Sequence, residues 1–201
     1  TTGVTTSNSA DLLLKAKRIY VEVNRHMPRS LSAELIHISQ VTALCENHVP
    51  LPVAPPAAID EVGATIGRLI AEQVVDGATL QLGIGAIPEA VALALQDKRD
   101  LGIHTELFTD GMVELIERGV VTNALKPIHR GKTVTTFAYG SKRVYDYLDD
   151  NPAFLVLPVD YVNDPKTIAR HPNFVSVNGA LEVDFYGQVC AESIGAKHVS
   201  G

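Results

Sequence analysis

The chain has 201 residues, of which 46% are hydrophobic and 20% are charged, so it has ample material for a core and is not intrinsically disordered. Its formal net charge of −6 argues against a nucleic-acid partner, because such partners need a basic protein face. No stretch approaches the ~20 apolar residues of a membrane span, so we expect no membrane partner either.

Residues 1–49 are predicted to form the end of an N-terminal α/β domain. We expect one helix and two strands there, over 11–17, 18–23 and 35–38. The next segment, 50–56, holds four prolines, which cannot sit inside a helix or a central strand. We interpret this segment as a proline-rich linker, followed by the first part of a C-terminal α/β domain over 57–201.

Helices and strands alternate after the linker. Apolar periodicity and capping residues predict helices over 59–74, 88–95, 112–116, 141–148 and from Asp164 onwards. Short apolar runs predict strands over 79–82, 103–107, 133–138, 154–158 and 174–177, and then a hairpin of 181–185 with 188–192. This alternation predicts an α/β fold with an open, mostly parallel sheet flanked by helices.

The first candidate site is the sequence LGIGAIPE, which follows a predicted strand and opens a predicted helix. Gly83 and Gly85 allow a tight turn and the close approach of a ligand. Free N–H groups and the positive end of the helix dipole favour an anionic or polar ligand there. A tight turn without a ligand is the alternative. A Rossmann dinucleotide site is disfavoured, because Pro88 replaces the third glycine of that motif.

The second candidate is Glu106, near the carboxyl end of the next predicted strand. Strand ends in an open α/β sheet converge on one crevice, so this carboxylate is expected beside the glycine turn. A glutamate in such a place can act as a nucleophile or as a general base. The alternative is a solvated carboxylate or a helix cap. Asp110 is predicted to cap the helix that follows.

The third candidate is the segment 176–184. Asn178-Gly179 predicts a turn between apolar runs, and the backbone from Gly179 to Leu181 is a further place where a ligand could lie close. Glu182 and Asp184 are two residues apart on a predicted strand, so they share a face. Such a carboxylate pair could serve glycoside hydrolysis, but the solvated face of an edge hairpin is the favoured interpretation.

Histidines and cysteines give no metal or redox signal. The seven histidines are scattered without metal-ligand spacing, and we expect His104, beside the candidate carboxylate, to have a structural role or to support a neighbouring site residue. Cys45 and Cys190 lack the paired spacing of a zinc site or a redox motif. Two free thiols and the lack of a signal-peptide pattern predict a cytoplasmic protein. Both ends of the sequence are interpreted as cuts through a longer protein.

Five ordered blocks together resemble one known family. They are LQLGIGAIPEAV, LGIHTELFTDGMVEL, FAYGSKRVYDYL, LPVDYVNDP and SVNGALEVDFYGQVCAESIG. Their order and spacing are similar to the acetyl-CoA hydrolase/transferase family, and in particular to its 4-hydroxybutyrate CoA-transferase group. EVNRHMP and HVPLP also fit this group, so the resemblance covers essentially the whole chain.

The resemblance implies the fold of a class I CoA-transferase, a two-domain enzyme of which this chain is a fragment, with residues 57–201 in the catalytic domain. It implies that Glu106 is the catalytic glutamate, which forms a covalent glutamyl-CoA thioester in a ping-pong reaction. It also implies contacts with CoA for Gly83, Ile84, Gly85, Ala86, Ile87 and Leu181. Coenzyme A is then a substrate, with no permanently bound cofactor and no metal.

The implied reaction moves CoA between a short-chain acyl-CoA and a small carboxylic acid of the 4-hydroxybutyrate or acetate type. Two alternatives stay open. One is an acetyl-CoA hydrolase that uses the same glutamate, and the other is a non-catalytic CoA-binding module. A homo-oligomer is expected.

Overall fold

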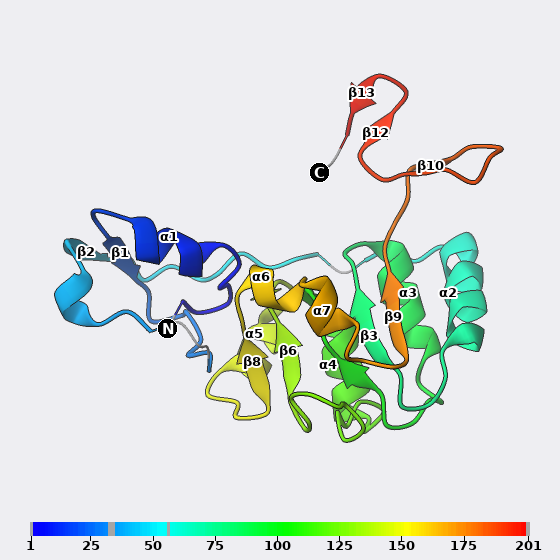
Figure 1. Cartoon of the computed structure of the whole chain (residues 1–201), viewed down its shortest axis with the longest axis horizontal. Helices are drawn as coiled ribbons and strands as arrows, with labels where there is room; N and C mark the ends of the chain where they lie inside the picture. Colours follow the sequence, from blue (N-terminus) through cyan, green and yellow to red (C-terminus); the bar gives the residue numbers. More distant parts are fainter. Residues whose placement is uncertain (1, 32–34, 56, 200–201) are drawn as a thin grey trace.

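The structure is a computed structural model that describes residues 2–31, 35–55 and 57–199 (Figure 1). Its N-terminal part contains α1 (Ser9–Lys15), β1 (Tyr20–Val23), a 3-10 helix (Ile38–Gln40) and β2 (Ala43–Glu46). β1 and β2 pair in parallel and lie with α1 at one end of the molecule, beside the main sheet (Figure 1). The helix predicted over 11–17 and the strand predicted over 18–23 are confirmed, with shifted boundaries.

The strand predicted over 35–38 is wrong. A 3-10 helix forms there because the His37 side chain accepts the Ser39 N–H, and the Gln40 side chain accepts the His37 N–H. The partner of β1 is β2, further along the chain. Local capping hydrogen bonds therefore outweigh the strand preference of a short apolar run.

The remaining elements alternate as predicted. The helices are α2 (Glu61–Gln73), α3 (Ala86–Ala94), α4 (Asp110–Glu117), α5 (Lys142–Leu148), α6 (Val159–Val162) and α7 (Pro165–Ile168). The strands of the main sheet are β3 (Thr79–Leu82), β4 (Gly102–Ile103), β5 (Leu107–Phe108), β6 (Thr133–Thr135), β7 (Phe137–Ala138), β8 (Phe154–Val156) and β9 (Phe174–Val177). Short strands follow as β10 (Glu182–Val183), β11 (Val189–Cys190), β12 (Ser193–Ile194) and β13 (Lys197–His198).

The main sheet is open and mostly parallel. β3 lies between β4 and β9 and pairs in parallel with both, while β5 pairs with β7 and β6 with β8. A parallel bridge between His104 and Val134 joins the β4 side of the sheet to β6. The predicted α/β fold, with an open, mostly parallel sheet flanked by helices, is confirmed.

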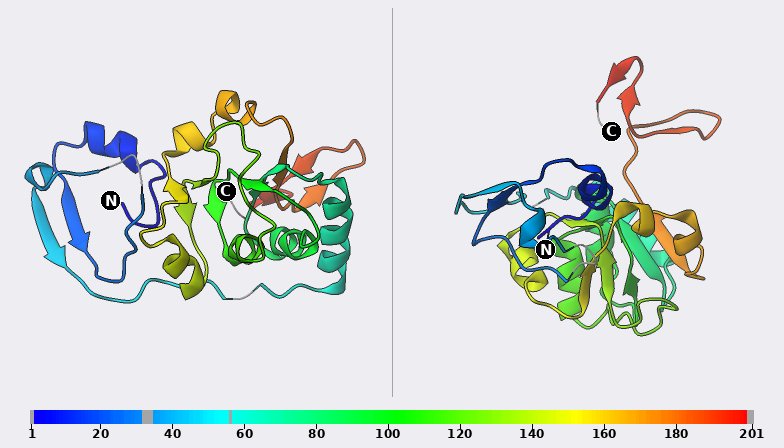
Figure 2. Two further views of the ribbon diagram at one scale, coloured as in Figure 1. Left: turned by 90° about the horizontal axis from the view of Figure 1, so that it is seen from below. Right: turned by 60° about the vertical axis from the view of Figure 1, so that its left-hand side comes forward.

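Helices lie on both sides of this sheet (Figure 2). α3, α4 and α5 cover one face, with α2 packed on α3, while α6 and α7 lie on the opposite side (Figure 2). The side chains of Asp60 and Asp164 accept backbone N–H groups at the starts of α2 and α7, as their capping positions predict. Between the sheet and the helices lies a continuous core that includes the fully buried Leu80, Ile103, Phe108, Met112, Leu148 and Phe154.

Asp110 is not the cap that the sequence suggests. It is the first residue of α4, and its carboxylate accepts the backbone N–H and the hydroxyl of Ser141, at the start of α5. Thr109 occupies the N-cap position. Asp110 thus connects the starts of two neighbouring helices.

Two predicted strands are interrupted at the same level of the sheet. The strand expected over 103–107 divides into β4 and β5, and the strand expected over 133–138 divides into β6 and β7. The carbonyl oxygen of Glu106 accepts both the Thr136 N–H at 3.1 Å and the Phe137 N–H at 3.0 Å. A shared acceptor of this kind disturbs the regular ladder, so both strands bend there.

The C-terminal strands form hairpins that extend away from the main sheet (Figure 1). β10 and β11 pair antiparallel, which confirms the predicted hairpin. The carboxylate of Asp184 accepts the Tyr186 and Gln188 N–H groups in the hairpin turn, and Glu182 is exposed. This arrangement agrees with the solvated edge hairpin favoured above and not with a catalytic carboxylate pair.

The turn predicted at Asn178-Gly179 is wrong. The chain leaves β9 in an extended conformation at these residues and continues to the hairpin (Figure 1). The Asn178 side chain, which would have stabilised such a turn, bonds across the strands to Gln81 instead.

The N-terminal residues contact the main sheet directly. Thr5 forms an antiparallel bridge with Phe137, and the Thr6 N–H donates to the Thr136 carbonyl at 2.9 Å. Within the proline-rich segment, the Pro52 carbonyl accepts the Tyr145 hydroxyl at 2.6 Å, whereas Pro56 lies outside the described residues. The division into 1–49, 50–56 and 57–201 stays a prediction. Among the described residues, no helix is both long and apolar enough to cross a membrane.

Candidate active site

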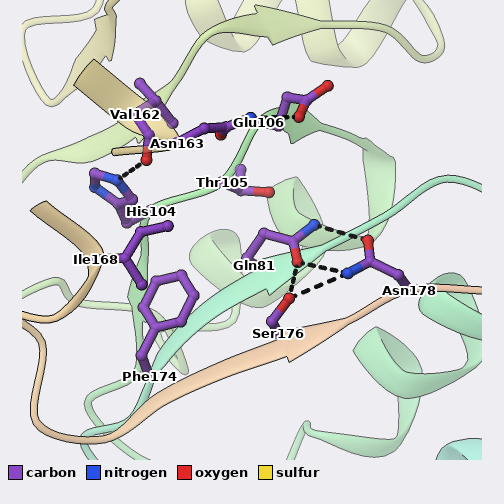
Figure 3. Close-up of a pocket in the computed structure, with 10 residues that line it drawn as sticks. All are labelled: Gln81, His104, Thr105, Glu106, Val162, Asn163, Ile168, Phe174, Ser176 and Asn178. Carbon is purple, nitrogen blue, oxygen red and sulfur yellow. Dashed lines mark hydrogen bonds between the residues drawn. The ribbon is translucent and has the colours of Figure 1, made fainter. Parts of the chain in front are cut away.

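A cavity of about 220 Å³ opens at the carboxyl ends of β3, β4 and β9, beneath α6 and α7 (Figure 3). Its walls combine polar groups from the strand ends with apolar groups from the helices and β9. The lining residues are Gln81, His104, Thr105, Glu106, Val162, Asn163, Ile168, Phe174, Ser176 and Asn178. Ligands of open α/β sheets bind at this edge, which makes the cavity the candidate site.

Glu106 lies at the rim of the cavity, in the break between β4 and β5. Its backbone is fixed, because its carbonyl also accepts the Thr135 hydroxyl at 2.8 Å. Its side chain is exposed, and Oε2 accepts the Nδ2–H of Asn163 from the end of α6 at 2.7 Å. The carboxylate is therefore accessible to a ligand while it is oriented by one amide donor.

Three polar side chains form a hydrogen-bonded network in the cavity wall (Figure 3). Gln81 Nε2–H donates to Asn178 Oδ1 at 3.1 Å, and Asn178 Nδ2–H donates to Gln81 Oε1, also at 3.1 Å. Ser176, directly opposite Gln81 in the β3–β9 register, donates its hydroxyl to the same Gln81 oxygen. The network places uncharged polar groups beside the Glu106 carboxylate, and it leaves one N–H of Gln81 unused within it.

The glycine turn lies beside this network. Gly83 donates its N–H to the Val177 carbonyl at 2.8 Å, and a Cβ added at Gly83 would lie 2.9 Å from Asn178 Oδ1. Gly85 is the N-cap residue of α3, and its φ of 115° is a conformation that favours glycine. By helix geometry, the N–H groups of Ala86 and Ile87 have no partner within α3.

The carboxyl group of Glu89 does not belong to the candidate site. Burial and then the nearby Asp110 carboxylate raise its pKa, while the Gly111 N–H hydrogen-bonds to it from α4. This carboxyl group therefore contacts α4, and it is not among the groups that line the cavity.

His104 is buried at the inner wall of the cavity, 1% exposed. Its Nε2 lies 2.8 Å from the Val162 carbonyl, which can only accept, so Nε2 carries the proton. Nδ1 has no hydrogen-bond partner among the described residues. Burial lowers the pKa of His104 to about 4, so the ring is neutral near pH 7. The structural role predicted for this residue agrees with these contacts.

The structure brings some of the predicted site residues together and leaves others apart. Thr105 connects the two main motifs, because its hydroxyl lies 3.3 Å from the Leu82 carbonyl that precedes the glycine turn. The turn residues 83–87 adjoin the cavity through Gly83 but do not line it. Leu181 lies next to the β10–β11 hairpin, where its N–H donates to the Cys190 carbonyl, and it too is absent from the cavity wall.

Sequence reasoning missed several polar residues of the wall. The sequence assigns Gln81 only to a strand and Ser176 only to the start of the third candidate segment, and it does not single out Asn163. Each of them is a polar residue at a strand end or just before the Asp164 cap. Such residues are too common to identify a site from the sequence alone. Among the described residues, no group of three or more His, Cys, Asp or Glu side chains could hold a metal ion.

An open α/β sheet with a polar cavity at its strand ends is typical of enzymes and binding proteins for small molecules. Residues 140–201 match the family described as acetyl-CoA hydrolase/transferase C-terminal domain. Over 199 residues, the chain is 45% identical to the 4-hydroxybutyrate coenzyme A transferase of Clostridium kluyveri, covering 99% of this chain and 46% of that protein. A less similar relative, 27% identical over 176 residues, is the acetyl-CoA hydrolase of Yarrowia lipolytica.

Solved structures agree with these matches. The crystal structure of RipA from Yersinia pestis has a TM-score of 0.91 at 48% identity, over 94% of this chain and 44% of that one. The 4-hydroxybutyrate CoA-transferase of Porphyromonas gingivalis has a TM-score of 0.89 at 40% identity, over 93% of this chain and 48% of that one. The chain belongs to the acetyl-CoA hydrolase/transferase family, and it spans about half the length of these relatives.

Proposed function

We propose that the protein containing this chain transfers CoA between a short-chain acyl-CoA and a carboxylic acid, with Glu106 as the nucleophile. The observation that carries this proposal is the Glu106 carboxylate itself. It is exposed at the rim of a polar cavity, fixed through its backbone, and oriented by a single amide donor from Asn163. Relatives over the whole chain are named CoA transferases, which supports the same assignment.

The chemistry follows from a carboxylate that meets a thioester. A Glu106 oxygen attacks the thioester carbonyl and displaces the CoA thiolate, which gives a mixed anhydride. The thiolate then attacks the glutamyl carbonyl, so that a glutamyl-CoA thioester forms and the first carboxylic acid leaves. A second carboxylate repeats these steps in reverse, and the energy of the thioester is conserved throughout. The net reaction needs neither a redox partner nor a proton source.

We assign the glycine turn to the CoA side of the site. The N–H groups of Ala86 and Ile87 at the start of α3 are suited to the negative charge of a CoA phosphate or of an oxyanion. One well-placed oxyanion donor typically contributes about 2.7–4 kcal/mol to a transition state. The exposed side chain of Ile84 adds an apolar surface beside them. We assign Leu181, on the segment that leads away from β9, to the same proposal as a second CoA contact.

Acetyl-CoA hydrolysis is the second candidate, because one relative carries that name. The two activities share the glutamyl intermediate and differ in whether water or a carboxylate resolves it. The wall of Gln81, Ser176 and Asn178 favours transfer, because the second N–H of Gln81 is not used within the wall and suits an acceptor carboxylate.

The test follows thioester turnover in the protein at its full native length, with acetyl-CoA as the donor and with or without 4-hydroxybutyrate or butyrate. A transferase consumes acetyl-CoA only when an acceptor is present and forms the new acyl-CoA in equal amount. Release of free CoA at the same rate without an acceptor would establish the hydrolase instead. Binding of CoA without any turnover would support a non-catalytic CoA-binding module and reject both enzymes.

A further inference from the structure

Two hydrogen bonds connect the segment that carries Glu106 to the end of α6. His104 Nε2–H donates to the Val162 carbonyl at 2.8 Å, and Asn163 Nδ2–H donates to Glu106 Oε2 at 2.7 Å. His104 and Glu106 are two residues apart on one segment, and Val162 and Asn163 are adjacent on the other. We propose that His104 is a positioning residue for Glu106: by holding the Val162 carbonyl, it fixes the place from which Asn163 orients the carboxylate. This inference rests on the proposed function of Glu106.

The alternation of side chains supports this pairing. Residues 104 and 106 project to the same side of an extended chain, and residue 105 projects to the other. Thr105 indeed turns away from α6, with its hydroxyl near the Leu82 and Leu107 carbonyls. His104 is directed toward Val162 and Glu106 toward Asn163, as Figure 3 shows.

The end of α6 is held from two sides. α6 is a helix of only four residues, and from the helix side the Asn163 N–H donates to the Val159 carbonyl at 2.8 Å. The Val162 side chain is buried, which sets the depth of the helix, but burial of an apolar group is not directional. The hydrogen bond from His104 to the Val162 carbonyl adds a directional contact from the sheet side, one residue before Asn163.

The surroundings of His104 keep this donor in one state. The ring of His171 lies 5.0 Å away between centroids, and the ring of Phe174 lies 6.2 Å away. The other charged or titratable neighbours are Lys126 and His129, which are also basic. Among the described residues, no carboxylate acts on His104 to favour the imidazolium, so the neutral ring with its proton on Nε2 persists.

The test compares three substitutions of His104 with one control. His104→Gln can place an N–H near the position of Nε2, whereas His104→Asn is too short and His104→Leu has no donor. His171→Phe is the control, because it removes the neighbouring imidazole and leaves the bond to Val162 intact. We measure the rate of the first half-reaction as the exchange of labelled acetate into acetyl-CoA, together with KM for acetyl-CoA.

His104→Asn and His104→Leu should lower kcat by about tenfold or more with little change in KM, as expected for one lost hydrogen bond. His104→Gln and His171→Phe should stay within about threefold of the unsubstituted protein, which is less than one hydrogen bond is worth. Equal rates in all four variants would overturn the inference and leave the proposed function of Glu106 intact.

A second measurement does not depend on catalysis. In an NMR spectrum, the side-chain amide of Asn163 should shift in His104→Asn and His104→Leu, and keep its position in His104→Gln and His171→Phe. If the unsubstituted protein shows no exchange at all, the proposed function fails, and this amide signal alone decides whether His104 positions Asn163. An Asn163 signal that is unchanged in every variant would reject the positioning role.

Discussion

At the scale of single residues, the position of Glu106 follows from simple rules, but its partners do not. A glutamate at the end of an apolar strand in an α/β pattern is expected at the edge where ligands bind. The structure places it there, at the rim of the cavity. Its partner Asn163 lies 57 residues further along the chain, at the end of a short helix that no capping pattern in the sequence predicts.

The first prediction concerns Asn163. Replacing it with alanine removes the side-chain donor that the structure gives to Glu106 Oε2. A hydrogen bond to a charged group contributes about 1.5–3 kcal/mol, so kcat for CoA transfer should fall by about 10- to 100-fold. Asp160→Ala is the matched control, because Asp160 is an exposed residue of the same helix that does not line the cavity. Equal kcat values for the two variants would show that Asn163 does not orient the nucleophile.

At the scale of elements, close packing between helix backbones determines which face of α2 is buried, and the amphipathic pattern does not predict it. The helix expected over 59–74 forms as α2, but Val62 and Leu69 of its apolar pattern are exposed. Its buried positions are Gly63, Gly67 and Ala71 instead. Small residues let α2 approach α3 closely, so the face that packs is the one with the smallest side chains.

The second prediction tests this helix contact. A Cβ added at Gly67 would lie 2.7 Å from the backbone carbon and oxygen of Ala90, and backbone atoms yield little. Overpacking lowers stability by about 1–3 kcal/mol, and the better helix propensity of alanine offsets up to ~1 kcal/mol of this loss. Gly67→Ala should therefore lower the free energy of unfolding by about 1–2 kcal/mol in urea titrations. Gly179→Ala, where an added Cβ meets nothing within 4 Å, serves as the control, and an equal effect there would contradict the packing argument.

The third prediction concerns the paired histidines beside the cavity. Burial lowers the pKa values of His104 and His171 to about 4, whereas both titrate near 6.5 in the unfolded chain. Between these values the unfolded state binds more protons, so stability is lost as the pH falls from about 6.5 to about 4. Each histidine contributes a slope of up to about 1.4 kcal/mol per pH unit.

Urea unfolding at pH 7 and at pH 5 measures this loss. His171→Phe removes one titrating group, so the difference between the two pH values should be smaller in that variant than in the unsubstituted protein. Lys126, whose pKa burial lowers to about 7, also titrates near the upper pH, but it is present in both proteins, so the comparison between them reports on His171. An identical pH dependence in both proteins would show that His171 is readily protonated in the folded state.

At the scale of the whole molecule, the order of helices and strands could be predicted from the sequence, since apolar runs and caps are local signals. The parallel sheet and the edge that carries the site follow from that alternation. The breaks at Glu106 and Thr136 could not be predicted, because they depend on a hydrogen bond between strands. The interpretation of Asn178 failed for the same reason, since its side chain bonds across the sheet to Gln81. Local reasoning therefore places Glu106 at the ligand-binding edge of the sheet and misses the amides around it.

The central claim is that the carboxylate of Glu106 becomes covalently attached to CoA. The direct measurement incubates the full-length protein with acetyl-CoA, reduces it with borohydride, and identifies the modified peptide by mass spectrometry. The account predicts that the Glu106 side chain alone is reduced to a primary alcohol, with no such product in Glu106→Gln or without acetyl-CoA. An unmodified Glu106 in a protein that still transfers CoA between acids would contradict the account.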